Sequence, residues 1–401
     1  MNFFLNQSSN TCPLSTSIAP KQFVHGGTRQ QRHSARKTSL SKEAPWLVFP
    51  PKEHEEEESE KTSMFTQFMK LEEKRFYTFN NGSAAKEMSS GESFCCVIGS
   101  SHGWLVCLDQ DFFPSLFNPF NCDQIQLPQI GSSLGIQRIG GSRRKIVSKA
   151  VLSSSYPSNE DYYVALIYGQ SSKLAFYRKG EDSWTALDSK QEISESYEDI
   201  ICHENLLYVL DVDAFLQVWD ILQCSGPVKK IEIKPDLINR DDTLGSSGAD
   251  FCFFVTVSYL VKSAGDLLLV VRYIGNFLTR VDKNSVPSYK TSHFEVFKLH
   301  IEQQLWIKVG SIGDRALFLG SNESMSVCAR DFKMFNRDSI YFTDDNWEDI
   351  ESNFSGGGHD MGMFSLEDKS VNVPDEYKME KTKAPPTWLV PHPWKQSIDR
   401  K

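Results

Sequence analysis

Residues 162–187 read YYVALIYGQSSKLAFYRKGEDSWTAL and hold three short apolar or alternating segments separated by polar turns. The segments are 162–169, 173–178 and 183–187. β-Branched and aromatic residues favour strands, whereas Gly, Ser and Asp favour tight turns. The stretch therefore predicts three consecutive antiparallel strands joined by hairpins.

The same pattern recurs along the chain. Its middle segment is found at 74–79, 115–120, 173–178, 216–221, 294–299 and 361–366. An alternating partner follows at 124–128, 183–187, 229–233, 305–309 and 370–374, and an apolar strand precedes it at 103–109, 162–169, 205–211, 265–273 and 337–344. Weaker segments such as 143–151 are expected to supply a fourth strand.

The spacing of these segments indicates the architecture. Tyr77 and Asn118 are 41 residues apart, and Tyr177 and Trp219 are 42 apart. A four-stranded propeller blade takes about 40–50 residues, and loops at 234–248 and 276–292 would explain the longer spacings. We predict an all-β chain: a single β-propeller of about six blades over 44–391, between a disordered tail at 1–43 and a C-terminal tail at 392–401.

Two similar segments, APWLVFP at 44–50 and PTWLVP at 386–391, suggest how the ring closes. We expect both to be inner strands of the closing blade, with the strand at 76–79 pairing into the sheet that the C-terminus completes. The composition agrees with a packed globular chain, since 40% of residues are hydrophobic and 12% aromatic.

The charge is unevenly distributed. The whole chain carries −9, but residues 1–42 contain six basic groups and no acid. The overall acidity argues against a nucleic-acid partner, which would require a basic face. The Ser-rich basic tail has the composition of an organellar transit peptide or of a plain disordered leader. Six Glu between 53 and 60 predict a solvated surface loop.

Other sequence features limit the location of the chain. No secretory signal is evident near the start, and the apolar run 251–261 is too short to span a bilayer. Nine Cys without any C-x-x-C pair indicate buried thiols in a reducing compartment. The four N-x-S sequons therefore carry no weight. We expect a mitochondrion or plastid if the tail is a transit peptide, and the cytoplasm or nucleus otherwise.

The segment Gly99-Ser100-Ser101-His102-Gly103 matches G-x-S-x-G, the nucleophile elbow of α/β-hydrolases. That motif needs a strand before it and a helix after it, whereas Trp104 opens a strand. The pattern also recurs at 131–135. We interpret Gly99–Trp104 as a tight turn that opens a blade, with the His102 side chain hydrogen-bonded to backbone.

Two further clusters suggest chemistry only weakly. The stretch 356–362, GGGHDMG, contains His359 and Asp360 but matches neither glycine-rich phosphate-binding motif, so we expect a loop leading into a strand. The acids at 344, 345, 348 and 349 lack the alternating ligand spacing of an EF-hand. We interpret them as a solvated loop at a blade edge.

Several segments together resemble a known family: SSHGWL at 100–105, LFNPFNCDQIQLP at 116–128, LAFYRKGEDSWTALD at 174–188, IYFTDD at 340–345, GGHDMGMFSLED at 357–368 and PPTWLVP at 385–391. The chain resembles the KIB-type β-propeller family of plants, whose members often follow an F-box. The resemblance implies a non-catalytic propeller that, in F-box members, holds a substrate protein for a ubiquitin ligase. Residues 1–43 lack the apolar helical periodicity of an F-box, so we expect no F-box there, and the resemblance alone does not imply binding to the ligase core.

We therefore predict a protein-recognition propeller that uses inter-blade loops to bind a protein partner and has no catalytic, cofactor-binding or metal-binding residue. One alternative is an organelle-targeted propeller with another role. The second is an enzyme with a site in the central channel, for which His102 and His359 are the residues to examine, both expected at equivalent strand entries.

Overall fold

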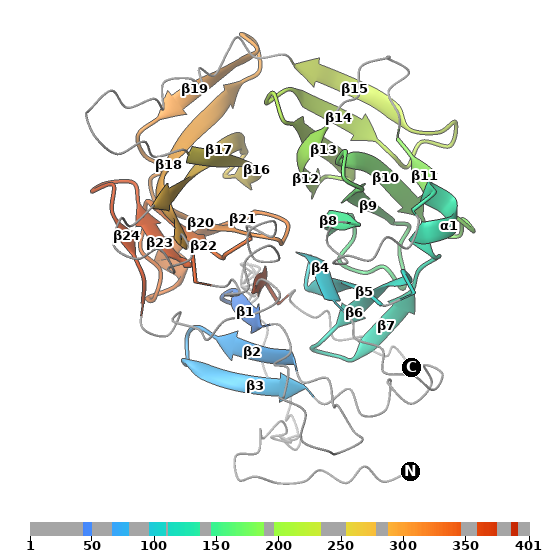
Figure 1. Ribbon diagram of the computed structural model, residues 1–401, viewed down its shortest axis with the longest axis horizontal. Helices are drawn as coiled ribbons and strands as arrows, with labels where there is room; N and C mark the ends of the chain where they lie inside the picture. Colours follow the sequence, from blue (N-terminus) through green and yellow to red (C-terminus); the bar gives the residue numbers. More distant parts are fainter. Residues whose placement is uncertain are drawn as a thin grey trace, which may run out of the picture. The chain divides into compact units, whose positions relative to one another are not determined.

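The computed structural model describes residues 43–49, 66–79, 96–109, 111–136, 146–187, 196–233, 254–277, 288–345, 359–374 and 386–391. Within these ranges the chain forms six antiparallel or mixed sheets arranged as the blades of a propeller (Figure 1). The prediction of an all-β, six-bladed propeller is confirmed. The predictions for residues 1–42, 53–60 and 392–401 lie outside the described residues.

Blades I to III each contain four strands, named in the order in which they pair. Blade I is β25 (Thr387–Leu389), β1 (Trp46–Phe49), β2 (Thr66–Lys70) and β3 (Arg75–Phe79); blade II is β4 (Cys96–Ser101), β5 (Trp104–Leu108), β6 (Pro114–Asn118) and β7 (Asp123–Gln126); blade III is β8 (Val147–Leu152), β9 (Tyr163–Tyr168), β10 (Lys173–Arg178) and β11 (Thr185–Ala186). A short helix, α1 (Ile130–Leu134), follows β7.

Blades IV to VI complete the ring. Blade IV is β12 (Tyr197–His203), β13 (Leu206–Asp211), β14 (Leu216–Asp220) and β15 (Val228–Ile233); blade V is β16 (Phe254–Ser263), β17 (Asp266–Phe277), β18 (Ser288–His300) and β19 (Leu305–Val309); blade VI is β21 (Met325–Cys328), β20 (Arg315–Leu319), β22 (Ser339–Phe342), β23 (Gly362–Ser365) and β24 (Val371–Asn372). A 3₁₀ turn, η4 (Ala329–Asp331), follows β21. We call the end at which β4, β8, β12 and β16 begin the entry face, and the opposite end the exit face.

Closure joins the two ends of the propeller in one sheet. β25 pairs antiparallel with β1, so that Leu47 lies opposite Trp388, and β1 then pairs with β2. Both W-L-V segments therefore lie in the closing blade, as expected. Only β25 is innermost, however, because β1 is the second strand of its sheet.

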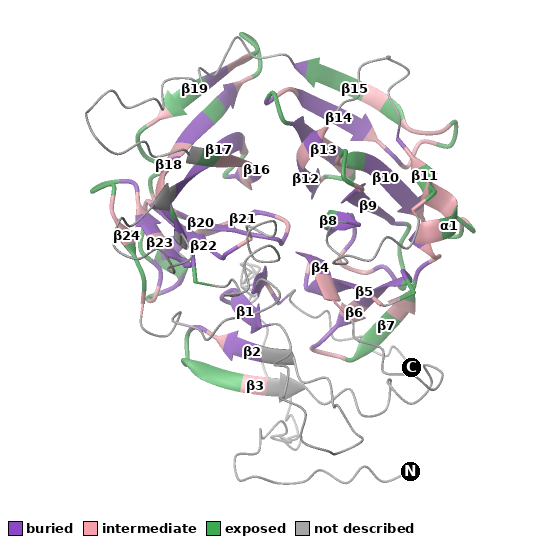
Figure 2. Cartoon of the chain, viewed as in Figure 1, coloured by how far each residue is buried: buried purple, intermediate pink, exposed green. Residues whose placement is uncertain are grey.

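Apolar side chains hold neighbouring blades together. Each of six buried clusters takes residues from two adjacent blades, and the set runs around the whole ring. Between blades V and VI, for example, Val270 and Phe294 pack with Phe342. Figure 2 shows burial concentrated on the inner strands and exposure on outer strands such as β7, β15 and β19.

Two features of the strand pattern differ from the prediction. The segment 74–79 is not equivalent to the other middle segments, because β3 is the outermost strand of blade I and β2 takes the third place. The expected loop at 276–292 is shorter than predicted, because β17 continues to Phe277 and β18 begins at Ser288. These two strands extend blade V on the entry face, and their polar and charged residues hid the strand pattern.

Blade VI departs from the regular plan. Its strand β20 runs parallel to β22, with Leu317 opposite Ile340, and β21 forms an additional strand antiparallel to β20. The hairpin β20–β21 therefore lies on the channel side of the blade, and Figure 1 shows it projecting into the centre of the ring. No helix in the described part of the chain is long and apolar enough to cross a membrane.

Candidate functional site

Ser101 does not occupy a nucleophile elbow. It is the last residue of β4 and is followed by the two-residue turn His102–Gly103 and then by β5. The turn is therefore shorter than the predicted Gly99–Trp104. The Ser101 side chain is 3% exposed, and its Oγ accepts a hydrogen bond from the Leu152 backbone N at 3.1 Å. This hydroxyl links blades II and III.

The structure separates the two candidate histidines. His102 lies in the β4–β5 turn on the exit face, with a φ of 51°. His359 precedes β23 on the entry face, where its Nε2 lies 3.0 Å from the Tyr289 carbonyl oxygen. The expectation that they occupy equivalent strand entries is wrong, and they do not form a common site. The stretch that contains His359 does lead into a strand, as predicted.

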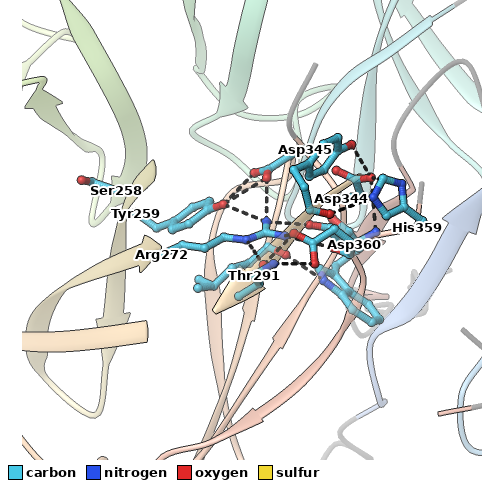
Figure 3. A network of polar contacts seen from close by, with 12 residues as sticks. Ser258, Tyr259, Arg272, Thr291, Asp344, Asp345, His359 and Asp360 are labelled. Atoms are coloured by element: carbon cyan, nitrogen blue, oxygen red, sulfur yellow. Dashed lines mark hydrogen bonds and ion pairs between the residues drawn. The ribbon is translucent and has the colours of Figure 1, made fainter. Parts of the chain in front are cut away.

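A buried arginine organises the entry face between blades V and VI. Arg272 on β17 is 0% exposed, and its guanidinium donates to the Asp345 carboxylate at 2.8 Å and to the Asp360 carboxylate at 3.0 Å. It also donates to the Thr343 carbonyl oxygen at 2.9 Å and to the Thr291 hydroxyl at 2.8 Å. Figure 3 shows Asp345, Asp360 and Thr291 around the guanidinium.

The carboxylates around Arg272 are themselves held in place. Asp360 accepts hydrogen bonds from the backbone N and the hydroxyl of Thr291, at 2.9 and 2.7 Å. Asp344 is 0% exposed and accepts from the Tyr289 hydroxyl at 2.8 Å. The expectation of a solvated loop is therefore wrong for Asp344 and Asp345, because both carboxylates turn toward blade V and its polar groups. Positions 348 and 349 lie outside the described residues.

Electrostatics keep the Arg272 guanidinium charged in this buried network. Burial on its own would lower the pKa of Arg272, but the nearby Tyr259, Asp360 and Asp345 outweigh burial and raise that pKa. Burial also raises the pKa of the Tyr259 hydroxyl well above its usual range, so this phenol stays neutral. A buried network with every member paired fixes a single geometry. Here it fixes both ends of the connection from β22 to β23.

A second polar structure crosses the channel. Glu323, in the turn between β20 and β21, donates its backbone N–H to the Ser100 carbonyl oxygen of blade II at 2.9 Å. Its carboxylate accepts from the Cys202 backbone N of blade IV at 2.6 Å. Blades II and IV are not neighbours of blade VI in the ring, so these bonds span the channel. The hairpin thus occupies part of the central channel.

Charged groups also join the inner strands of blades III, IV and V. Lys149 on β8 forms a buried ion pair with Asp199 on β12. The second oxygen of Asp199 accepts from the Leu260 backbone N on β16 at 2.7 Å. Burial raises the pKa of Asp199, an effect that the Lys149 charge opposes. Together with the bond from Leu152 to Ser101, these contacts link the inner strands of blades II to V.

The described residues contain no group of three or more His, Cys, Asp or Glu side chains placed to hold a metal ion. Six described cysteines are free thiols. Cys107 and Cys202 are buried as expected, whereas Cys122 and Cys224 are exposed.

Comparison with known proteins places this architecture in a family. The model of the KIB1-4 beta-propeller family matches residues 68–365, which is well over half of the chain. The chain belongs to the KIB1-4 β-propeller family. Its curated relatives include two proteins of Arabidopsis thaliana. One, named "Putative F-box protein At5g55150", is 28% identical over 292 residues, covering 70% of this chain and 71% of the relative. F-box protein SKIP23 is 21% identical over 338 residues, covering 74% and 76%.

Solved structures give a more distant likeness. The β-propeller domain of Cps50 (Swd1) from Myceliophteria thermophila covers 80% of this KIB1-4 propeller at 9% identity, with a TM-score of 0.33. A structural likeness with so low a TM-score is no basis for assigning a function. The family match and the strand topology are the observations on which the assignment rests.

Sequence patterns missed the two residues that organise this KIB1-4 propeller. Arg272 lies within a segment predicted only as an apolar strand, although a lone charge in a buried strand requires a countercharge and could have signalled the network. Glu323 belongs to the β20–β21 hairpin, which the repeat pattern did not include. Its short strands and Ser-rich turn gave no periodic signal.

Proposed function

We propose that this propeller is a protein-recognition module with no chemistry of its own, and that its partner binds at the entry face. Membership of a family whose relatives are named F-box proteins supports a role in protein interaction. The Arg272 network is the observation that favours the entry face over the exit face. Arg272 is buried where it pairs with two aspartates and fixes the end of β22 and the start of β23 against blade V, and a recognition surface requires such a fixed base.

The entry face near this network presents exposed groups on a rigid base. The Val255 side chain on β16 is 49% exposed, Lys290 on β18 is exposed, and the His359 side chain is 43% exposed. Exposed apolar and polar groups of this kind on one face of the propeller suit a partner that offers apolar and acidic side chains. The exit face of the same blade offers a matched control, since Ile301 is 68% exposed in the β18–β19 turn.

Affinity capture with three proteins tests the proposal. Wild type, Val255→Asp and Ile301→Asp are used in parallel on extract from native tissue, after circular dichroism has shown that all three are equally folded. We expect the Val255→Asp variant to lose specific partners that the wild type and the Ile301→Asp variant retain. If only Ile301→Asp loses these partners, the binding surface lies on the exit face. Equal capture by all three proteins would contradict the proposal.

The location of the partner depends on residues 1–43. Residues 1–42 of this tail are basic, acid-free and Ser-rich, a composition that supports a transit peptide, which would place recognition inside a mitochondrion or plastid. Fusion of residues 1–50 to a fluorescent reporter tests this. Punctate signal with a shortened reporter is expected for a transit peptide, whereas diffuse signal without cleavage would favour the cytoplasm or nucleus.

A further inference from the structure

The turn of the β20–β21 hairpin is lined by buried polar atoms that lack hydrogen-bond partners within the described protein. They are the side-chain oxygens of Ser321, Asn322, Ser324 and Thr343. These residues are 4%, 0%, 6% and 0% exposed. We call this set the axial polar site.

At least two of these atoms, from different segments, lie close to one another. The Thr343 backbone N donates to the Leu319 carbonyl oxygen at 3.1 Å, which places the end of β22 against the start of the turn. A Cβ built on Gly320 would lie 2.1 Å from Thr343 Oγ1 and 3.2 Å from Asn322 Oδ1. Both oxygens therefore lie next to the position that a side chain on Gly320 would take, and Ser321 and Ser324 belong to the same turn.

The orientation of the Asn322 amide follows from its other contacts. Its Nδ2 donates to the Glu323 carbonyl oxygen at 2.7 Å and to the Phe318 carbonyl oxygen at 3.5 Å. A flipped amide would set its oxygen against two carbonyls, so Oδ1 is the atom without a partner. It is an acceptor that needs a donor.

Native proteins leave very few buried polar atoms unpaired. Four in one small region would cost a free energy comparable with the whole stability of an ordinary domain. Each hydroxyl needs an acceptor for the hydrogen bond that it donates, and the amide oxygen needs a donor. A water molecule meets both needs, whereas an alkali cation would satisfy the oxygens and leave the hydroxyl protons without acceptors.

We propose that the axial polar site binds a cluster of buried water molecules that joins the channel-crossing hairpin to the end of β22. The hairpin is then held on one side by Glu323 through direct bonds to blades II and IV, and on the other through water. The site shares Thr343 with the entry-face network, which uses the Thr343 carbonyl oxygen and not its hydroxyl, and the inference does not depend on the proposed function.

The direction in which a single substitution shifts Tm tests the proposal. Thr343→Val keeps the shape and removes the hydroxyl. If water is bound there, the variant deprives it of a partner and Tm falls. If the site is dry, the variant removes an unpaired buried hydroxyl and Tm rises. Thr291→Val is the reference, because the Thr291 hydroxyl has two protein partners and its loss must lower Tm.

A direct measurement supports the thermal one. Water ¹⁷O relaxation dispersion counts long-lived internal waters in the full chain, and we expect the count to fall in Thr343→Val and, should that variant fold poorly, in Ser321→Ala. An unchanged count, or a rise in Tm with Thr343→Val, would overturn the proposal. So would a Tm of the wild type that depends on exchanging Na⁺ for K⁺ or choline at fixed ionic strength, because a cation would then occupy the site.

Discussion

Glu323 and Cys202 meet across the centre of the ring. The Cys202 backbone N donates to the Glu323 carboxylate at 2.6 Å, although the two residues belong to blades VI and IV, which share no edge. A propeller is ordinarily held together by contacts between neighbouring blades. Here one carboxylate adds a link through the channel, and the stability of the ring should depend on it.

Removing that link should destabilise the fold. We expect Glu323→Ala to lower the free energy of unfolding by about 1.5–3 kcal/mol, the range for hydrogen bonds to a charged group. Urea denaturation followed by circular dichroism measures the change. Glu204→Ala is the control, because the Glu204 side chain is 81% exposed and should matter little. Equal midpoints for the two variants would show that the hairpin does not depend on this carboxylate.

The Arg272 network should be far more sensitive than a surface ion pair. Arg272→Met leaves buried aspartates without their cation, and breaking such a pair costs about 3–5 kcal/mol. Arg330→Met removes a surface partner of Asp314 from a side chain that is 75% exposed, and should cost under about 1 kcal/mol. Chemical denaturation of both variants gives the comparison. A small effect of Arg272→Met would mean that the aspartates are satisfied without it.

The inner strands of blades II and III approach too closely for a side chain at Gly99. A Cβ there would lie 2.1 Å from the Ala150 carbonyl oxygen. We expect Gly99→Ala to force the strands apart at a cost of about 1–3 kcal/mol. Gly310→Ala is the matched control, since no atom lies within 4 Å of its Cβ position. Thermal unfolding of both variants tests this, and similar Tm values would contradict the close packing.

Acid should weaken the fold through His293. Burial lowers the pKa of His293, and the charges of Lys308 and Lys369 add to this, while Glu295 opposes it. The folded state thus binds the proton less well than the unfolded chain. The stability that neutral His293 contributes is fully present above the ordinary pKa of about 6.5, and it is lost as pH falls through the lower pKa of the folded state.

Measuring the free energy of unfolding between pH 8 and pH 5 tests this predicted loss of stability in acid. We expect the decline to be shallower in His293→Gln than in the wild type, while His300→Gln at the end of the same strand keeps the wild-type slope. A decline as steep in His293→Gln as in the wild type would assign the acid sensitivity to other groups.

The sequence predicted the repeated part of the fold well. Strands such as β9 and β10 combine β-branched or aromatic residues with sharp turns, so local chemistry alone identifies them. Blade closure was also predictable, because the two W-L-V segments stand at the two ends of the propeller sequence. The hairpin β20–β21 was not, since its parallel neighbour β22 is chosen by packing and not by local pattern.

The polar networks were harder to predict for a physical reason. Asp344 and Asp345 look like solvated acids because their partners, Tyr289 and Arg272, lie far away in the sequence. Charge patterning reports local composition, whereas burial of a charge depends on which distant strand faces it. Only the isolated Arg272 in an apolar strand carried a usable signal.

Binding of a purified partner tests the central claim most directly. Once capture has identified a partner, titration calorimetry with wild type, Val255→Asp and Ile301→Asp gives three dissociation constants. A charge placed in the binding surface should weaken binding by at least about 30-fold, the equivalent of about 2 kcal/mol, so this is expected for Val255→Asp. Ile301→Asp should bind as the wild type does. Unchanged affinity for Val255→Asp, or a loss confined to Ile301→Asp, would contradict recognition at the entry face.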